Sequence, residues 1–382
     1  MSSVHEVGGH KLTLLRSGTE YFPQLFAAIH AARHTIYLET YIFAADQTGR
    51  LLKAALESAA ARDVSVHVLL DGFGSAELPP AWLGEMRMLG VKVLWFRPEL
   101  ARWSLRRHRL RRLHRKLVVI DGRIAFVGGI NILDESQEAR LDYAVQVQGE
   151  VVAQITHAVR SLWRLVSWTH LRKSGLPRER MVPSAQQHDV AFLIRDNLRH
   201  RRDIEHAYLR AIKHARSEIV IANAYFLPGR RFRRFLLAAA RRGVRVVLLL
   251  QGKMEYRLQH YATLALYEDL LLAGMEIYEY TPSFLHAKVA VIDGEWATVG
   301  SSNIDPFSLL MAREANIIVK DNGFAAGLRG DLLEAITHGG KRVMSSDLQH
   351  RALWGRIVLR ISYAVVRFLT GISGYAHRRD DF

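Results

Sequence analysis

Apolar strands and helical segments alternate along the chain, and this alternation occurs twice. In HAARHTIYLETYIF (residues 30–43) a helix end leads into a strand that finishes on aromatic residues, and RDVSVHVLLDG (62–72) supplies a second strand. The same order returns in KHARSEIVIANAYF (213–226) and RGVRVVLLLQG (242–252). Each half therefore predicts helix, strand, helix, strand, a further helix and a hairpin. Because such alternation places helices on both faces of a sheet, we expect an α/β fold.

The two predicted hairpins carry the same polar residues at the same spacing. Residues 110–145 and 282–317 align on two histidines. The shared positions are His114, Lys116, Asp121-Gly122, Gly128, Asn131 and Asp142 in the first segment, and His286, Lys288, Asp293-Gly294, Gly300, Asn303 and Glu314 in the second. We interpret the match as an internal repeat. An inactive second copy is the alternative, but both copies retain His, Lys and Asn.

A polar, turn-rich segment within residues 172–190 separates the two copies. Clusters of Gly, Pro, Ser and charged residues between periodic segments are typical of linkers. We therefore expect a first half over residues 1–180, a second half over 181–345 and a C-terminal tail over 346–382.

Each histidine lies two residues before its lysine in a predicted strand. Residues two apart in a strand point to the same face, so His114 and Lys116 are expected side by side, as are His286 and Lys288. The Asp-Gly pair makes a tight turn, and the return strand brings the asparagine back toward the histidine. An imidazole, an ammonium and a carboxamide together suit a phosphate group. A lone His-x-Lys pair is usually surface decoration, so this interpretation depends on the repeat.

The acid that closes each repeat is expected to orient the histidine of its own half. Asp142 would accept a hydrogen bond from His114, and this would set the tautomer as in a catalytic triad. Glu314 would do the same for His286. Two facing halves would put a histidine on each side of one phosphorus, so that one attacks and the other protonates the leaving oxygen. A metal centre is the competing use of histidines, but the sequence has no HExxH motif and no dense carboxylate cluster.

Composition narrows the classes of partner. The chain has 382 residues and a formal net charge of +16, which favours nucleic acid, an anionic membrane or a phosphorylated substrate. It has no cysteine, which excludes disulfides, thiolate metal sites and a cysteine nucleophile. We identify no targeting segment and no run of 18 uncharged apolar residues, so we expect no transmembrane helix.

The pattern His-x-Lys-x4-Asp-x6-Gly-[Gly/Ser]-x-Asn, present twice, resembles the phospholipase D superfamily over nearly the whole chain. Its short two-motif form is most similar to bacterial cardiolipin synthases of the type without N-terminal transmembrane helices. The resemblance implies two similar α-β-α sandwich halves related by pseudo-two-fold symmetry around one shared active site. It also implies a phosphohistidine intermediate, no metal or other cofactor, and a monomer that is sufficient for one site.

The resemblance implies roles for the repeated residues. His114 would be the nucleophile, and His286 would protonate the leaving group and then activate the acceptor hydroxyl, although the symmetry of the sequence does not itself choose between them. The phosphate oxygens would be bound by Lys116, Lys288, Asn131, Asn303 and Ser301. The first copy has Gly129 in place of Ser301, so this hydroxyl contact is missing there or supplied elsewhere. Asp121 and Asp293 complete the catalytic motifs, yet their place at a hairpin turn favours a structural role.

Two basic segments bear on the choice between lipid and nucleic acid. Residues 101–116 contain eight Lys or Arg and lead into the first motif, which suits anionic headgroups and DNA phosphates equally. Residues 351–369 predict a basic amphipathic helix suited to a membrane interface. A helix packed on the domain or on a second subunit is the alternative.

We therefore expect a phosphatidyltransferase, peripheral on the cytoplasmic face of the cell membrane, with no nucleic-acid partner. It would join phosphatidylglycerol to a second phospholipid, form cardiolipin and release glycerol. The alternatives are a phospholipase D that transfers to water, a metal-independent nuclease and a non-catalytic protein that binds anionic lipid. The acceptor is left open between phosphatidylglycerol, phosphatidylethanolamine and a free alcohol.

Overall fold

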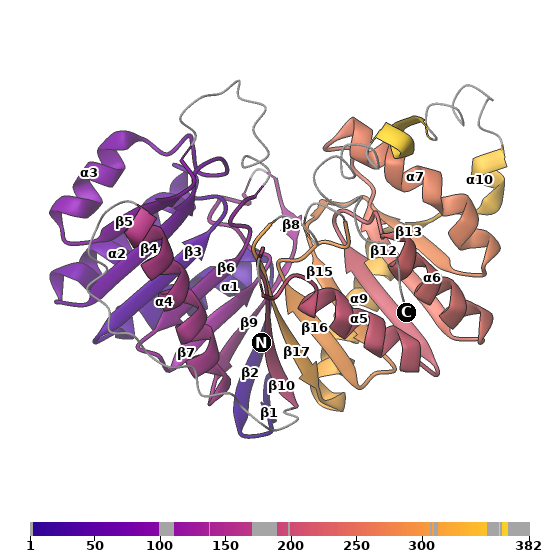
Figure 1. Ribbon diagram of the computed structural model, residues 1–382, viewed down its shortest axis with the longest axis horizontal. Coiled ribbons are helices and arrows are strands. Elements are labelled where there is room, and N and C mark those ends of the chain that lie inside the picture. The colour runs from indigo at the N-terminus through magenta and orange to yellow at the C-terminus, as the bar shows by residue number, and fades with distance from the viewer. Residues whose placement is uncertain are drawn as a thin grey trace.

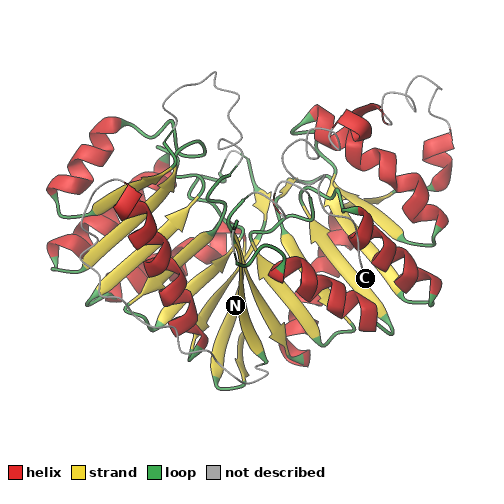
Figure 2. Ribbon diagram, viewed as in Figure 1, coloured by secondary structure: helices red, strands yellow, loops and turns green. Residues whose placement is uncertain are grey.

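Two eight-stranded sheets lie side by side, and helices pack on both faces of each (Figures 1 and 2). The structure is a computed structural model that describes residues 3–98, 111–136, 138–169, 189–197, 199–305, 308, 312–349, 359 and 361–365. We call the part that contains β1 to β9 the first half and the part that contains β10 to β18 the second half. The α/β prediction with two similar halves is confirmed.

The first sheet mixes parallel and antiparallel pairs. In spatial order its strands are β1 (Val4–Val7), β2 (His10–Arg16), β9 (Tyr143–Gln148), β7 (Ile124–Gly128), β6 (Lys116–Ile120), β3 (Thr35–Thr40), β4 (Ser65–Asp71) and β5 (Lys92–Phe96). Strands β3, β4 and β5 are parallel, and the other neighbours are antiparallel.

The second sheet repeats this order. Its strands are β10 (Val190–Arg195), β17 (Glu314–Lys320), β16 (Trp296–Gly300), β15 (Lys288–Ile292), β11 (Glu218–Asn223), β12 (Arg245–Gln251), β13 (Glu276–Tyr280) and β18 (Gly340–Arg342). Seven strands correspond one to one between the sheets, and β1 and β18 are additions at opposite edges. The sequence pattern predicted β3, β4, β6 and β7 in the first half and β11, β12, β15 and β16 in the second, and it missed the other strands of both sheets.

The helices cover the sheets in equivalent positions. They are α1 (Ser17–Ala31), α2 (Gln47–Ala61), α3 (Pro80–Met88) and α4 (Val151–Thr169) in the first half, and α5 (Asp203–His214), α6 (Arg230–Arg241), α7 (Arg257–Leu272), α9 (Asn322–Gly339) and α10 (Ser345–Gln349) in the second. None of the helices in the described ranges has both the length and the apolar character that a membrane span requires.

The core joins the two halves. One apolar cluster contains side chains of α4 and α9 and of the central strands of both sheets. A second cluster lies under α1, α2 and α3, and a third lies under α5, α6 and α7. Every residue of β6 and β15 is buried. Because these strands are buried on both faces, every residue after the first lysine of each strand is apolar.

Three predicted segments lie largely or partly outside the described residues. The basic segment is described from residue 111 onward, and the linker from residue 189 onward. Of the predicted tail helix, residues 359 and 361–365 are described and are helical. There Leu359 and Tyr363 pack against the core of the second half, whereas Ile361 and Val365 are exposed.

Candidate active site

The central strands of the two sheets begin at the motif lysines, and each histidine lies two residues earlier. Lys116 is the first residue of β6 and Lys288 the first of β15. The ammonium of Lys116 donates to the carbonyl of His114 over 2.9 Å, and Lys288 donates in the same way to the carbonyl of His286. Both lysines are buried. The predicted proximity of His and Lys within each half is therefore present.

The acids bind the histidines of opposite halves. Nδ1 of His114 lies 3.0 Å from Oε1 of Glu314, and Nδ1 of His286 lies 2.6 Å from Oδ2 of Asp142. The prediction that each acid orients the histidine of its own half is wrong. Because Nδ1 of each imidazole faces a carboxylate, Nε2 is the ring nitrogen left for a reacting group.

Backbone pairing between the halves explains the crossing. The amide of His114 donates to the carbonyl of Arg313 over 3.0 Å, so the next residue, Glu314, comes beside the ring. Likewise the amide of His286 donates to the carbonyl of Leu141 over 2.9 Å, next to Asp142. A small parallel sheet formed by β8 (Arg140–Leu141) and β14 (Phe284–Leu285) continues the second pairing.

The four basic groups of the site share one buried, positive environment. Burial and the charge of Lys288 lower the pKa of Lys116 to about 7, and burial lowers the pKa of Lys288 to about 8 although Asp142 opposes it. Burial and the charge of Lys288 lower the pKa of His286 to about 3. Burial also lowers the pKa of His114, against the charge of Glu314. Both imidazoles are therefore neutral at neutral pH in the free protein.

The two carboxyl groups remain ionised in this environment. Burial acts to raise their pKa values, but Lys288 and His286 outweigh it at Asp142, and His114 and Lys116 outweigh it at Glu314. The net result is a lowered pKa for each carboxyl. Two carboxylates and two ammonium groups thus balance before any ligand binds, and a phosphodiester would add one negative charge.

Asp121 and Asp293 lie at the opposite end of the strands from the histidines. Both have positive φ, 52° and 54°, in the hairpin turns. Asp121 accepts from the backbone amides of residues 33, 34 and 35, and Asp293 from those of residues 216, 217 and 218. A five-residue strand spans about 16 Å, so these carboxylates hold the helix-to-strand turns and do not contact a ligand at the histidines. Counting them as catalytic is wrong, and the structural interpretation of the turn fits.

Ser301 contacts the carboxylate of Glu314. Its hydroxyl donates to Oε2 of Glu314 over 2.6 Å and accepts from the amide of Ala315 over 3.0 Å. Both of these contacts are internal, and the predicted role of Ser301 in phosphate binding remains a prediction. In the first half a side chain at Gly129 would overlap the carboxylate of Asp142. The first half therefore combines the shorter Asp142 with Gly129, and the second half combines the longer Glu314 with Ser301. Both combinations place a carboxylate beside a motif histidine.

The two motif asparagines each have a hydrogen-bond partner. Oδ1 of Asn131 accepts from the amide of Ile42 over 3.3 Å, which turns its amide N–H groups away from that contact. Nδ2 of Asn303 lies 3.4 Å from the hydroxyl of Ser308. Both are buried. Their role as phosphate donors remains a prediction.

Sequence reasoning missed the pair Asp71 and Gln251. Asp71 accepts from the amide of Leu113 over 2.7 Å, and Gln251 exchanges two hydrogen bonds of 3.3 Å with the backbone of Leu285. Each therefore fixes the residue immediately before a catalytic-motif histidine. The signal was present as LLDG and LLQG at the ends of the aligned strands. Tyr41 adds an edge-on contact to His114, with ring centroids 5.1 Å apart.

Metal ligation finds no support in the arrangement of side chains. Groups of three or more His, Asp or Glu in ligating positions do not occur within the described ranges. The site is instead a paired set of acid, histidine and lysine.

Comparison with protein families and curated proteins gives consistent matches. The family described as "Cardiolipin synthase, PLD-like domain" matches residues 25–163 and 208–334. Cardiolipin synthase B of Escherichia coli (strain K12) is 39% identical over 382 residues, covering 96% of this chain and 90% of the relative. A cardiolipin synthase of Geobacillus kaustophilus is 31% identical over 370 residues, covering 94% and 73%.

Solved structures share the fold. Phosphatidylserine synthase of Haemophilus influenzae aligns with a TM-score of 0.69 at 13% identity and covers 94% of both chains. Polyphosphate kinase of Porphyromonas gingivalis aligns with a TM-score of 0.59 at 14% identity, covering 95% of this chain and 53% of the other.

Proposed function

Because this chain belongs to the family of phospholipase D-like cardiolipin synthases, we propose that it is a phosphatidyltransferase that forms cardiolipin from phosphatidylglycerol and a second phospholipid. The single observation that carries the chemistry is the crossed pair of acid-bound histidines. Each imidazole is held through Nδ1 by a carboxylate, so each presents Nε2 as nucleophile or proton carrier. Both motifs belong to one chain, which supports a monomer as sufficient for one site.

In the first step the neutral His114 attacks the phosphorus of phosphatidylglycerol through Nε2. A P–N bond forms and the P–O bond to glycerol breaks. His286, which takes up a proton from solvent when the substrate binds, gives its Nε2 proton to the departing oxygen. Lys116 and Lys288, with Asn131 and Asn303, bind the non-bridging oxygens, where negative charge increases in the transition state. The anionic phosphodiester offsets the field of the two lysines, which raises the pKa of His286 from its low value in the free protein.

In the second step His286 takes the proton from the acceptor hydroxyl. The acceptor oxygen attacks the phosphorus, the P–N bond breaks, and His114 returns to its neutral form. Atoms and charge balance over the two steps without an oxidant or metal. Attack by water in place of the lipid hydroxyl would give phosphatidic acid, so the products measure transfer against hydrolysis.

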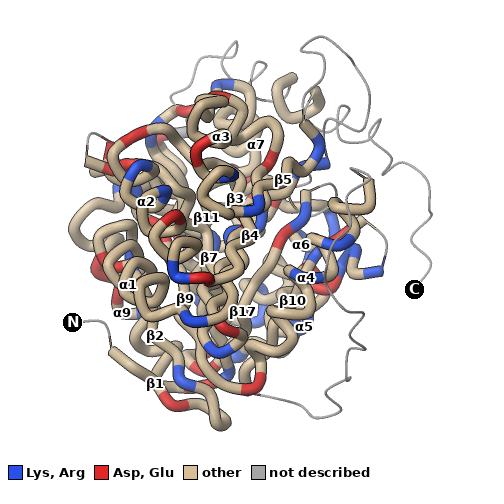
Figure 3. Tube along the Cα trace, turned by 90° about the vertical axis from the view of Figure 1, so that its left-hand side faces the viewer, with Lys and Arg blue, Asp and Glu red and all other residues tan. Residues whose placement is uncertain are grey.

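We further propose that the protein acts as a peripheral protein at the cytoplasmic membrane surface. Exposed apolar side chains follow β4 and β12, whose ends hold the residues before each histidine. We call them the apolar rim: Phe73, Met254, Tyr256 and Leu258, which are 53%, 46%, 58% and 42% exposed. Arginines lie along α6 (Figure 3). The cytoplasmic leaflet carries anionic lipid and attracts such basic segments. The tail 346–382 would add to this contact.

The experiment incubates the purified full chain with labelled phosphatidylglycerol vesicles in the presence of a chelator. We expect cardiolipin and free glycerol. His114→Ala and His286→Ala should each abolish turnover, and denaturation at alkaline pH, where a P–N bond survives, should retain the phosphorus label of the substrate on His114. Phosphatidic acid alone would indicate a hydrolase. An active His114→Ala variant would overturn the mechanism.

A further inference from the structure

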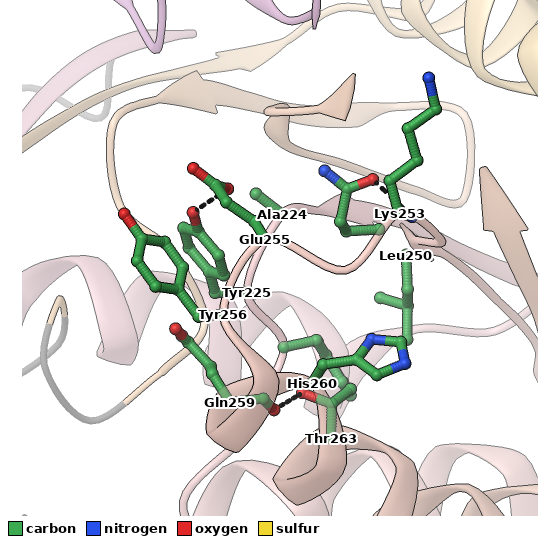
Figure 4. Close-up of a pocket in the computed structure, with 11 residues that line it drawn as sticks. Ala224, Tyr225, Leu250, Lys253, Glu255, Tyr256, Gln259, His260 and Thr263 are labelled. Atoms are coloured by element: carbon green, nitrogen blue, oxygen red, sulfur yellow. Dashed lines mark hydrogen bonds between the residues drawn. The ribbon is translucent and has the colours of Figure 1, made fainter. Parts of the chain in front are cut away.

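A small pocket in the second half is lined in part by residues that contact the segment around His286. Its lining includes Tyr225, Lys253, Glu255, Tyr256, Gln259 and His260, and its volume is about 30 Å³ (Figure 4). A cavity needs about 10–15 Å³ to hold one water-sized group. The pocket therefore has room for about two such groups, such as one hydroxyl-bearing carbon of a glycerol headgroup.

The pocket adjoins the reacting groups through three contacts. Its floor residue Ala224 donates its amide to the carbonyl of Ala287 over 2.9 Å. Gln251, which also lines it, is bonded to Leu285, the residue before His286. The charge of Glu255 acts on Lys288. An alcohol in this pocket is therefore on the side of His286, the group assigned to protonate or deprotonate alcohol oxygens.

The lining chemistry suits a neutral polyol. The hydroxyl of Tyr225 donates to Oε2 of Glu255 over 2.5 Å, and burial and the charge of Glu255 raise the pKa of Tyr225, so the phenol remains a donor. A carboxylate that accepts, an amide at Gln259 and two tyrosine rings 6.0 Å apart can bind and enclose hydroxyl-bearing carbons. The neighbouring cations Lys253 and Arg140 oppose an ammonium group in the same place.

Those two cations are placed for a second anion. Lys253 and Arg140 each lie 5.6 Å from the centroid of the Phe284 ring. Lys253 also donates to the carbonyl of Pro282 over 3.2 Å, and Arg140 pairs with the exposed Glu138 over 3.1 Å. Met254, Tyr256 and Leu258 of the apolar rim stand at the same loop. A headgroup bound here would have its glycerol in the pocket, its own phosphate near the cations and its acyl chains toward the rim.

We propose that this pocket is the subsite for the acceptor lipid: Glu255, Tyr225 and Gln259 bind the headgroup hydroxyl that does not react, and Lys253 with Arg140 binds the phosphate of that lipid. The inference rests on the proposed function and names its acceptor as a glycerophospholipid with a glycerol headgroup. The glycerol that leaves in the first step departs from the same pocket, so the glycerol headgroup of a second phosphatidylglycerol can take its place.

The test measures how one phosphoenzyme divides between acceptors, because a ratio of products cancels any change in the first step. The full chain receives phosphatidylglycerol vesicles with either ethanol alone or ethanol and labelled free glycerol. We expect Glu255→Gln and Tyr225→Phe to lower cardiolipin relative to phosphatidylethanol at least tenfold. Lys253→Gln should lower that ratio severalfold while leaving labelled phosphatidylglycerol relative to phosphatidylethanol unchanged, since free glycerol has no phosphate.

The control variant is Asp269→Asn, an exposed acid of α7 that pairs with Arg233 outside the pocket. It should leave every ratio unchanged. Unchanged ratios in Glu255→Gln would overturn the subsite, and an equal loss of free-glycerol transfer in Lys253→Gln would overturn the phosphate contact. A wild-type chain that forms neither cardiolipin nor phosphatidylethanol would instead overturn the proposed function itself.

Discussion

In the first half Glu39 and Arg115 form a buried ion pair of 2.9 Å next to His114, whereas the equivalent positions of the second half are Ala222 and Ala287. The same contrast recurs at the strand ends, where Asp71 in one half corresponds to Gln251 in the other. Both halves build the same histidine and lysine geometry. Around the histidine the first half therefore adds a buried ion pair and an aspartate, and the second half has two alanines and a glutamine at the same positions.

Comparison of the two halves shows which residues both copies of the repeat supply to the active site. Histidine, lysine and a carboxylate are supplied twice, and the carboxylates are exchanged between the halves. The buried pair Glu39 and Arg115, by contrast, occurs in the first copy and not in the second. Two halves that each completed their own histidine could diverge independently, but the exchanged acids make each half incomplete without the other.

The largest expected effect tests the exchange. Glu314→Gln and Asp142→Asn should each lower kcat by about 10²–10⁴-fold, since the loss of a triad acid disturbs the histidine tautomer. The activities of the two variants should differ on a phosphodiester donor with a p-nitrophenyl leaving group, because this group leaves without a general acid. With it, Asp142→Asn should retain rapid release of p-nitrophenol and Glu314→Gln should not, because Glu314 holds the nucleophile.

Stopped-flow absorbance of p-nitrophenol measures this directly, and the two histidine variants are the reference. His286→Ala should behave like Asp142→Asn, and His114→Ala like Glu314→Gln. The reverse pairing would show that each acid serves the histidine of its own half in solution.

The buried ion pair predicts an effect on stability. Glu39→Ala leaves the guanidinium of Arg115 buried without its partner and should lower the free energy of unfolding by about 3–5 kcal/mol. The double variant Glu39→Ala with Arg115→Ala has the two alanines that the second half has at these positions. It should be less destabilised than the single variant, despite its smaller side chains. Denaturant unfolding followed by circular dichroism measures both. A double variant at least as unstable as Glu39→Ala would contradict this view of the pair.

The pH profile should distinguish the two lysines. The pKa of Lys116 is lowered to about 7 and that of Lys288 to about 8. Since each must be protonated to bind phosphate, kcat/KM should fall as the pH rises through 7. In Lys116→Arg the charge persists, so the fall in its remaining activity should move toward pH 8. Initial rates between pH 5 and 9 on phosphatidylglycerol micelles test this, and an unmoved profile would assign the fall to another group.

The smallest effect concerns the serine that the first half lacks. Ser301→Ala removes the hydrogen bond to Glu314, which is worth about 0.5–1.5 kcal/mol. We expect a fall in kcat of about 2- to 10-fold, with the p-nitrophenyl donor affected as much as phosphatidylglycerol. Initial-rate kinetics measures it, and Ser302→Ala, whose hydroxyl lies 3.5 Å from the carbonyl of Asn303, is the neighbouring control. A change in KM alone would instead support the predicted role of Ser301 in phosphate binding.

The repeat, the motif and the geometry inside each half could be predicted from the sequence. Strand periodicity puts His114 beside Lys116, and an Asp-Gly turn with positive φ reverses the chain. Both features depend on a few neighbouring residues, so the sequence is enough to predict them. The position of Asp121 and Asp293 in these turns also favoured a structural role, and their hydrogen bonds to backbone amides agree with it.

Only the tertiary structure decided how the halves complete each other. The partners Glu314 and His114 are 200 positions apart, and Asp142 and His286 are 144 apart. Equal spacing within two identical motifs fits a same-half pairing and a crossed pairing equally well. Packing of the two sheets brings Arg313 to His114 and Leu141 to His286, and that contact between surfaces, rather than any pattern along the chain, selects the crossed arrangement.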